Sequence, residues 1–308
     1  EPWQCFIVTT VFGWVHHEPR LRRFLEAYEE EARKNGKSAK GSALLLYMLA
    51  ADGEHGAECY TAATTRDQAR IVFDDAKAMA ERSPGLRTHL GVAIMQHSLT
   101  VAHTSSKAAP LAAEGSTLDG LNVHFALLDE LHAHKTRAVY DVIDSARGAR
   151  EQSLLWTITT AGTDRSGICY ERRTHVTKIL DRVVQDERVF GIIYTLDDGD
   201  DPMDSANWIK ANPKDLTVRT YLAERSLSEQ KYDQAVQQYR QMQEIAPKNP
   251  MVLNNLAWVS GEIKSPKALE YAEKANQLAP NQPAFMDTLA MLLAAKGENA
   301  KAIELLRK

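Results

Sequence analysis

The sequence predicts an α/β region with a mostly parallel sheet and flanking helices, followed by an all-α solenoid of helical repeats. The first observation is the alternation of short apolar segments with helical ones up to about Pro213, which is typical of parallel sheets. The second is that all ten histidines and all predicted strands precede Pro213. The third is a repeat with a period near 34 residues after it. We therefore predict two domains, residues 1–213 and 214–308.

Five segments of the first region are predicted to form strands, because each is short, apolar and rich in β-branched or aromatic residues. They are residues 57–62, 98–103, 123–129, 154–160 and 189–196. Helical periodicity fills the intervals, and Thr65 followed by Gln68 is typical of a capped helix start. By contrast, Glu29, Glu30 and Glu31 are consecutive carboxylates, and we expect their segment to suit a buried strand poorly.

A phosphate-binding loop is predicted in the segment Arg33, Lys34, Asn35, Gly36, Lys37 and Ser38. The segment is a variant of G-x-x-x-x-G-K-[ST], because Glu31 stands where that pattern has its first glycine. Gly36 would let backbone N–H groups approach phosphates, and Lys37 would reach the terminal phosphate as a cation. The Ser38 hydroxyl would ligate Mg²⁺ at the start of the following helix. Arg33 and Asn35 belong to the same loop, so the sequence predicts a site for ATP and Mg²⁺.

An acidic pair follows the apolar run at residues 125–128, where Asp129 and Glu130 stand side by side. The run is typical of a strand buried on both faces, and parallel sheets bind ligands at the carboxyl ends of their strands. Asp129 is therefore a candidate metal ligand. Glu130 is the candidate base that orients and deprotonates the attacking water. Taken alone, such a pair could merely end a strand, and its combination with Lys37 and Ser38 favours catalysis.

Composition limits the remaining classes of protein. With 308 residues, of which 44% are hydrophobic and 25% charged, the chain is large enough for two globular domains. The apolar segment 43–51 is too short to cross a bilayer, so we expect a cytoplasmic protein without a membrane partner. Cys5, Cys59 and Cys169 are too widely spaced to indicate a disulfide framework or a zinc site. The net charge of -4 confines any contact with nucleic acid to a local patch.

The second region repeats small residues at a regular interval. Leu222-Ala223, Leu256-Ala257 and Leu289-Ala290 recur at spacings of 34 and 33 residues, and Ala235, Ala268 and Ala302 keep nearly the same interval. Pro247 and Pro280 also recur. This period, with small residues where helices cross, resembles the tetratricopeptide repeat, of which we predict about three. Such repeats imply an unidentified peptide or protein partner.

The first region resembles the ATPase domain of the large terminase subunit of tailed phages. The resemblance covers residues 1–213 and is carried by segments in the family's order, at residues 1–4, 33–38, 51–54, 62–70, 117–122, 129–135, 159–162 and 208–213. It implies an ATPase that drives double-stranded DNA into a procapsid. The implied partners are DNA, the portal and the small terminase subunit, and a homo-oligomeric ring is possible.

Three further site residues follow from this resemblance. Gln4 resembles the glutamine that contacts adenine, and Thr159 with Thr160 resembles the motif that senses the terminal phosphate. The alternatives are an exposed polar residue for Gln4 and plain β-propensity for the threonines. Arg147 and Arg150 are candidates for an arginine offered to a neighbouring subunit, although such arginines are more often solvated. They are not counted as catalytic.

Two motifs have competing interpretations. His132 and His134 have an H-x-H spacing that can bind metal, but the lack of further spaced ligands favours polar loop residues. The acidic run at residues 197–201 could bind a cation, whereas a solvated acidic turn is the more common outcome.

The sequence departs from the terminase pattern after residue 213, where members of that family continue into a nuclease domain. This chain changes to helical repeats instead, so we do not expect it to cut DNA. The leading hypothesis is an active ATPase joined to a protein-binding module. The alternative is a tetratricopeptide scaffold with an inactive ATPase half, because the carboxylates of Glu29, Glu30 and Glu31 would each oppose bound ATP by about 2 kcal/mol at an effective dielectric near 20.

Overall fold

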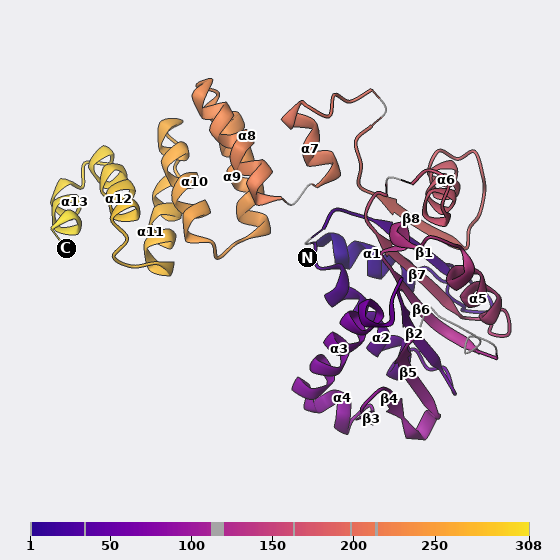
Figure 1. Ribbon diagram of the computed structural model, residues 1–308. Coiled ribbons are helices and arrows are strands. Elements are labelled where there is room, and N and C mark those ends of the chain that lie inside the picture. The colour runs from indigo at the N-terminus through magenta and orange to yellow at the C-terminus, as the bar shows by residue number, and fades with distance from the viewer. Residues whose placement is uncertain are drawn as a thin grey trace. The chain divides into compact units, whose positions relative to one another are not determined.

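The computed structural model describes residues 2–33, 35–111, 120–162, 164–197, 199–212 and 215–307 (Figure 1). Contacts divide the chain into two compact units, Glu1–Tyr194 and Thr195–Lys308. The domain boundary predicted at Pro213 lies outside the described residues and stays a prediction. The segment 117–119 of the terminase resemblance lies outside them as well.

A mixed sheet of eight strands forms the centre of the first unit, in the order β3-β4-β5-β2-β6-β7-β1-β8. The pairs from β5 to β8 along this order are parallel, whereas β3, β4 and β5 pair antiparallel. The strands are β1 (Glu26–Glu30), β2 (Glu58–Ala62), β3 (Val92–Ile94), β4 (Leu99–Val101), β5 (Ser106–Pro110), β6 (Val123–Asp129), β7 (Leu154–Thr159) and β8 (Val189–Ile193). The predicted α/β class is confirmed. The predicted segment 98–103 is shorter than expected, because η1 (Ala102–Thr104) follows β4 at once.

Helices cover both faces of this sheet, as Figure 1 shows. The first face packs against α1 (Pro2–Gly13), α2 (Lys37–Ala50) and α3 (Arg66–Arg82), with α4 (Pro84–Thr88) following. The second face packs against α5 (Ala138–Ala146) and α6 (Ile168–Leu180). Side chains of β6 alternate between the two cores: Phe125 and Leu127 join the first, whereas Ala126 and Leu128 join the second. Burial on both faces explains the continuous apolar sequence of this strand.

The strand β1 contradicts the expectation that consecutive glutamates suit a buried strand poorly. All five of its residues are buried, and it pairs with β7 on one side and β8 on the other. Glu29 forms an ion pair with Lys40 and accepts a hydrogen bond from Trp156 Nε1 at 3.1 Å. Glu30 accepts from Tyr28 at 2.9 Å and from Arg173 Nε at 3.1 Å. The expectation failed because each buried carboxylate has a partner from elsewhere in the fold.

The second unit consists of helices in the described residues. After α7 (Ser205–Ala211) come three pairs joined by short loops: α8 (Leu216–Ser228) with α9 (Tyr232–Ile245), α10 (Pro250–Glu262) with α11 (Ala268–Leu278), and α12 (Pro283–Ala295) with α13 (Asn299–Leu306). The recurring alanines are buried, from Ala223 and Ala257 in the first helices to Ala235 and Ala302 in the second. This region resembles tetratricopeptide proteins, as predicted.

The helix α7 packs within the second unit. Trp208 stacks on Tyr221 of α8 with ring centroids 6.3 Å apart. In the acidic run, Lys210 Nζ contacts Asp197 and Asp200, each at 2.8 Å. The run is thus held by a lysine of its own chain, which supports the interpretation as an acidic turn; Asp198 lies outside the described residues.

Candidate functional site

Three neighbouring parallel strands end at one edge of the sheet and bring the predicted site residues together. β7 lies between β1 and β6, with Glu30 opposite Thr159 and Asp129 opposite Ile158. The predicted phosphate loop follows β1. Asp129 is the last residue of β6 and Thr159 is the last residue of β7, and Glu130 and Thr160 directly follow them. Because all three strands run in the same direction, residues far apart in sequence meet at their carboxyl ends.

The predicted phosphate loop leads directly into α2. Gly36 precedes the helix with a φ of 77°, a left-handed conformation that glycine adopts without strain. The first turn of a helix leaves backbone N–H groups without intrahelical partners, which suits an anion. Gln4 of α1 lies beside this loop, because its Nε2 donates to the carbonyl of Asn35 at 3.3 Å. The structure thus places Gln4 at the loop.

Lys37 occupies the first turn of α2 and is buried. Its Nζ donates to the carbonyl oxygen of Glu31 at 3.1 Å, which spans the loop. Burial lowers the pKa of Lys37, whereas the charges of Glu130, Glu31 and Asp129 act in the opposite direction. The nearby charge of Arg33 lowers it further, although the Arg33 side chain is itself exposed. The Lys37 cation is therefore close enough to Asp129 and Glu130 for their charges to raise its pKa.

Asp129 and Glu130 differ in environment. Burial raises the pKa of Asp129 to about 6, the neighbouring charge of Glu130 adds to this increase, and Lys37 opposes it. Glu130 leaves the strand in a left-handed conformation with φ 52° and donates its backbone N–H to Ile158 O at 2.9 Å. Glu130 Oε2 is buried and has no hydrogen bond of good geometry to the described residues. A carboxylate oxygen without a well-aligned partner fits a role in orienting a water molecule.

Ser38 completes the set predicted to hold Mg²⁺. It lies half-buried in the first turn of α2, beside Lys37. Hydroxyl and carboxylate oxygens are the ligands that Mg²⁺ prefers, and it usually retains waters and binds substrate phosphates as well. Ser38 and Asp129 therefore fit this ion. The described residues include no group of three or more His, Cys, Asp or Glu placed to hold a metal, so the H-x-H interpretation as a zinc site gains no support.

The two threonines at the end of β7 contact a residue that the sequence did not assign to the site. Thr159 Oγ1 accepts the backbone N–H of His132 at 3.1 Å, and the His132 ring lies next to both hydroxyl groups. His132 belongs to η3 (Leu131–Ala133), which directly follows Glu130. In the sequence, its position close behind the acidic pair was the feature that could have assigned it to the site. The second histidine of the H-x-H motif, His134, is buried, and burial lowers its pKa.

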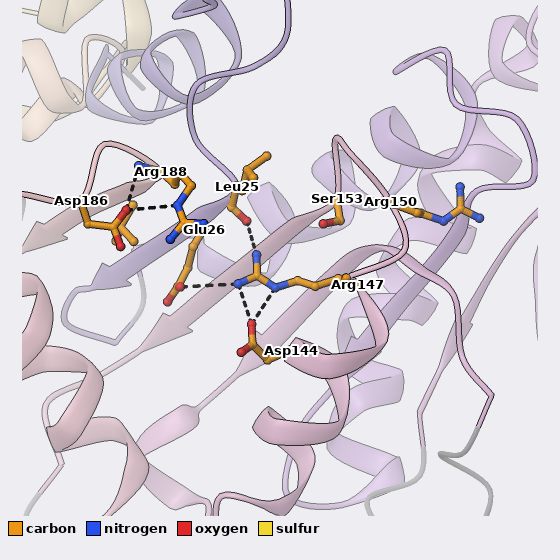
Figure 2. Close-up of a pocket in the computed structure, with 10 residues that line it drawn as sticks. Leu25, Glu26, Asp144, Arg147, Arg150, Ser153, Asp186 and Arg188 are labelled. Carbon is orange, nitrogen blue, oxygen red and sulfur yellow. Dashed lines mark hydrogen bonds and ion pairs between the residues drawn. The ribbon is translucent and has the colours of Figure 1, made fainter.

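Arg147 and Arg150 lie at the opposite edge of the sheet, where the strands begin. They line a pocket of about 430 Å³ with residues that precede or start β1, β7 and β8. Figure 2 shows the lining side chains. Arg147 donates to Leu25 O at 2.8 Å and pairs with Asp144 at 2.6 Å. Arg150 pairs with Glu54 at 2.5 Å. Both arginines are therefore engaged within their own chain, away from the phosphate loop.

No helix in the described part of the chain is both long and apolar enough to cross a membrane.

Known proteins resemble most of the first unit. The family model described as "Terminase large subunit, ATPase domain" matches residues 2–178. The terminase large subunit of Lactococcus phage p2 is 28% identical over 195 residues, which cover 61% of this chain and 35% of that protein. That of Enterobacteria phage HK97 is 26% identical over 204 residues, covering 65% and 38%. Protein YmfN of Escherichia coli K12 is 46% identical over 95 residues, covering 31% and 21%.

A solved structure has the same fold. The crystal structure of the HK97 large terminase aligns with a TM-score of 0.60 and 24% identity, over 76% of this chain and 48% of that one. The chain spans between about a fifth and two fifths of the length of the curated relatives named above.

Proposed function

The chain belongs to the family of terminase large-subunit ATPase domains, and from this membership we propose that its first region binds ATP with Mg²⁺ and hydrolyses it. The observation that carries the proposal is that the loop before Lys37, the acidic pair and Thr159 lie at the carboxyl ends of three adjacent parallel strands, β1, β6 and β7. Each residue type matches one requirement of phosphoryl transfer, namely a cation, a base and a polar group that detects the terminal phosphate.

In this proposal each residue has a separate role in binding or catalysis. The loop amides and Lys37 bind the phosphates, and Gln4 with the loop residues Arg33 and Asn35 contacts the nucleotide. Ser38 and Asp129 hold Mg²⁺, which when bound neutralises charge on the phosphate oxygens. Glu130 orients the attacking water and accepts its proton, a role that contributes about 10²- to 10⁴-fold in rate.

Steady-state phosphate release from the full chain tests this assignment. Lys37→Ala and Glu130→Gln should each lower Mg²⁺-dependent turnover by at least about 100-fold. Glu130→Gln should still bind MgATP within a few-fold of wild type, because it retains the phosphate loop. The exposed residues Lys178 and Glu187 supply matched controls, and Lys178→Ala and Glu187→Gln should keep wild-type turnover. Equal turnover in all five proteins would refute the assignment.

The wider role follows from family membership and is part of the proposal. We infer that ATP hydrolysis drives double-stranded DNA into a procapsid. The partners would be the portal and the small terminase subunit, and the active form would be a homo-oligomeric ring. A cytoplasmic location fits such a role. The helical pairs of the second unit would recruit a further peptide or protein.

An inactive ATPase half joined to a binding scaffold is the competing function. One reason for this alternative is that consecutive glutamates would repel ATP. The ion pairs of Glu29 and Glu30 remove much of that repulsion. Thermal unfolding in MgATP separates the two functions. A ligand at a hundred times its dissociation constant stabilises by about 2.7 kcal/mol, so millimolar MgATP should raise the unfolding midpoint. An unchanged midpoint would support the scaffold.

A further inference from the structure

The side chain of His132 lies between the proposed catalytic base and the threonines of β7. Its Nδ1 is 3.1 Å from Glu130 Oε2, 3.1 Å from Thr159 Oγ1 and 3.3 Å from Thr160 Oγ1. The side chain is 19% exposed, so the surrounding residues restrict its rotation without sealing it from solvent. One nitrogen atom thus contacts both motifs of the site.

Hydrogen-bond accounting places a proton on this nitrogen. The hydroxyl of Thr159 donates to Thr160 O at 3.0 Å, so its oxygen remains an acceptor toward the His132 ring. An ionised Glu130 can only accept. If Nδ1 were unprotonated, it could accept only from the Thr160 hydroxyl at 3.3 Å, and its lone pair would face the lone pairs of Thr159 Oγ1 and Glu130 Oε2 at 3.1 Å. Two acceptor oxygens lie closer to Nδ1 than the one possible donor does, so we assign a hydrogen to Nδ1.

This single N–H has two competing acceptor groups. A hydrogen bond weakens steeply as its angle narrows, so one N–H serves one well-aligned acceptor at a time. The geometry directs the Nδ1–H to the threonines. Glu130 Oε2 is only 3.1 Å from Nδ1, but it is buried and has no well-aligned partner among the described residues. Turning the imidazole would transfer the hydrogen bond from Thr159 to Glu130.

The loop after β7 fixes the position of the ring. A Cβ atom added at Gly162 would lie 2.9 Å from His132 Cβ, closer than two carbon atoms can approach without displacement. The backbone N–H of His132 is also bound to Thr159. The end of β7 and the loop after it are therefore in direct contact with His132.

We propose that His132 is a positioning residue that transmits the state of the nucleotide from the β7 threonines to Glu130. When the terminal phosphate engages a threonine hydroxyl, the Nδ1–H turns to Glu130 Oε2 and fixes the carboxylate with its other oxygen toward the attacking water. This inference rests on the proposed ATPase function. It gives a role to the first histidine of the H-x-H motif without a metal ion.

A set of three substitutions in the full chain separates this role from a purely structural one. His132→Asn keeps an amide N–H near the position of Nδ1, His132→Gln moves the N–H to the position of Nε2, and His132→Ala removes it. We expect kcat to fall about 10- to 100-fold in the Ala and Gln variants and to stay within about threefold of wild type in the Asn variant. MgATP affinity and the unfolding midpoint should change little. His97→Ala, at an exposed histidine, is the control.

A double-mutant cycle tests whether His132 acts through Thr159. Thr159→Val removes the hydroxyl while it keeps the buried volume of the side chain. The double variant His132→Ala with Thr159→Val should lose no more kcat than the more affected single variant, because both changes break the same link. Multiplied losses would overturn the inference, and so would wild-type kcat in His132→Ala.

Nitrogen NMR of the imidazole supplies a readout that needs no turnover. We expect the Nδ1–H tautomer for His132, with a shift of its resonance on addition of a non-hydrolysable ATP analogue and Mg²⁺ that is absent in Thr159→Val. An Nε2–H tautomer would refute the inference even if the chain hydrolyses ATP. A wild-type chain without Mg²⁺-dependent hydrolysis would instead refute the proposed function, and the catalytic part of the inference with it.

Discussion

At the scale of single residues, the buried carboxylates of β1 depend on partners from two helices, α2 and α6. Glu26 pairs with Arg172 of α6 at 2.6 Å, and Glu30 pairs with Arg173 of the same helix. Glu29 pairs with Lys40 of α2. A buried ion pair contributes little net stability, but the removal of one partner leaves a charge without compensation. These pairs therefore make the sequence of β1 sensitive to single substitutions.

Lys40→Met is predicted to destabilise the protein by about 3 to 5 kcal/mol, because Glu29 would keep a buried negative charge without its cation. The double variant Glu29→Gln with Lys40→Met should recover most of this loss, since the amide can still accept from Trp156 Nε1. Urea unfolding followed by tryptophan fluorescence measures both. If the two single changes add in the double variant, the charges are not coupled.

The raised pKa of Asp129 predicts a pH dependence of nucleotide binding. The folded-state pKa of about 6 lies above the ordinary 3.8, so burial penalises the ionised form. For the unliganded protein, the contribution of this group to stability is complete below about pH 4 and is lost as the pH rises through 6. Binding of Mg²⁺ needs the ionised form and has the opposite trend. MgATP affinity should therefore be about tenfold lower at pH 5 than at pH 7.

Fluorescence titration with a labelled ATP analogue at several pH values measures this dependence. Because the charge of Glu130 contributes to the raised pKa, Glu130→Gln should move the midpoint to lower pH. An affinity that is constant from pH 5 to pH 7 in wild type would contradict the assignment of Asp129 as the metal ligand.

At the scale of elements, the helix α2 carries the proposed phosphate-binding residues. It packs closely against the sheet at Gly41. A Cβ added at Gly41 would lie 2.6 Å from Leu127 Cδ2 of β6. Leu127 is fully buried, so it has little space into which it could move. This close approach sets the height of Lys37 and Ser38 above the strand that ends in Asp129.

Gly41→Ala tests this seating. Alanine favours a helix over glycine by about 1 kcal/mol, but overpacking of a core costs about 1 to 3 kcal/mol. We expect a net loss of stability and a lower kcat, because α2 must shift at its amino end. Leu127→Val removes the Cδ atoms and should relieve the clash in the double variant. A stabilised Gly41→Ala protein with wild-type kcat would show that the helix is not held at this point.

At the scale of the whole molecule, the chain has separate hydrophobic cores in its two compact units. The cores of the first unit lie on the two faces of the sheet, whereas those of the second are built from α8 to α13. Among the described residues, each of these clusters lies within one unit. Each unit therefore has its own source of stability.

The units are predicted to unfold independently. The first proteolytic cut should fall within residues 195–204, where no helix or strand is found among the described residues and most side chains are exposed. The fragment from the cut to Lys308 should stay helical by circular dichroism, and the fragment that ends near Tyr194 should keep its MgATP-dependent midpoint. Resistance to cleavage there, together with one transition for every probe, would contradict independence.

The sequence by itself determined the features that short segments encode. The α/β class followed from apolar runs such as β6, the helical repeats from the period of the buried alanines, and the candidate site from Lys37, Ser38 and the acidic pair. These are patterns of neighbouring residues, whose periodicity and chemistry can be recognised without knowledge of the fold.

Only the tertiary structure decided that β1 is a buried strand and that His132 joins Glu130 to the β7 threonines. Arg173 is 143 residues from Glu30, and His132 is 27 residues from Thr159, so no local pattern indicates either contact. The physical reason is that burial of a charge or a hydrogen-bonding group is decided by the partner it meets, and the partner is supplied by the packing of distant elements.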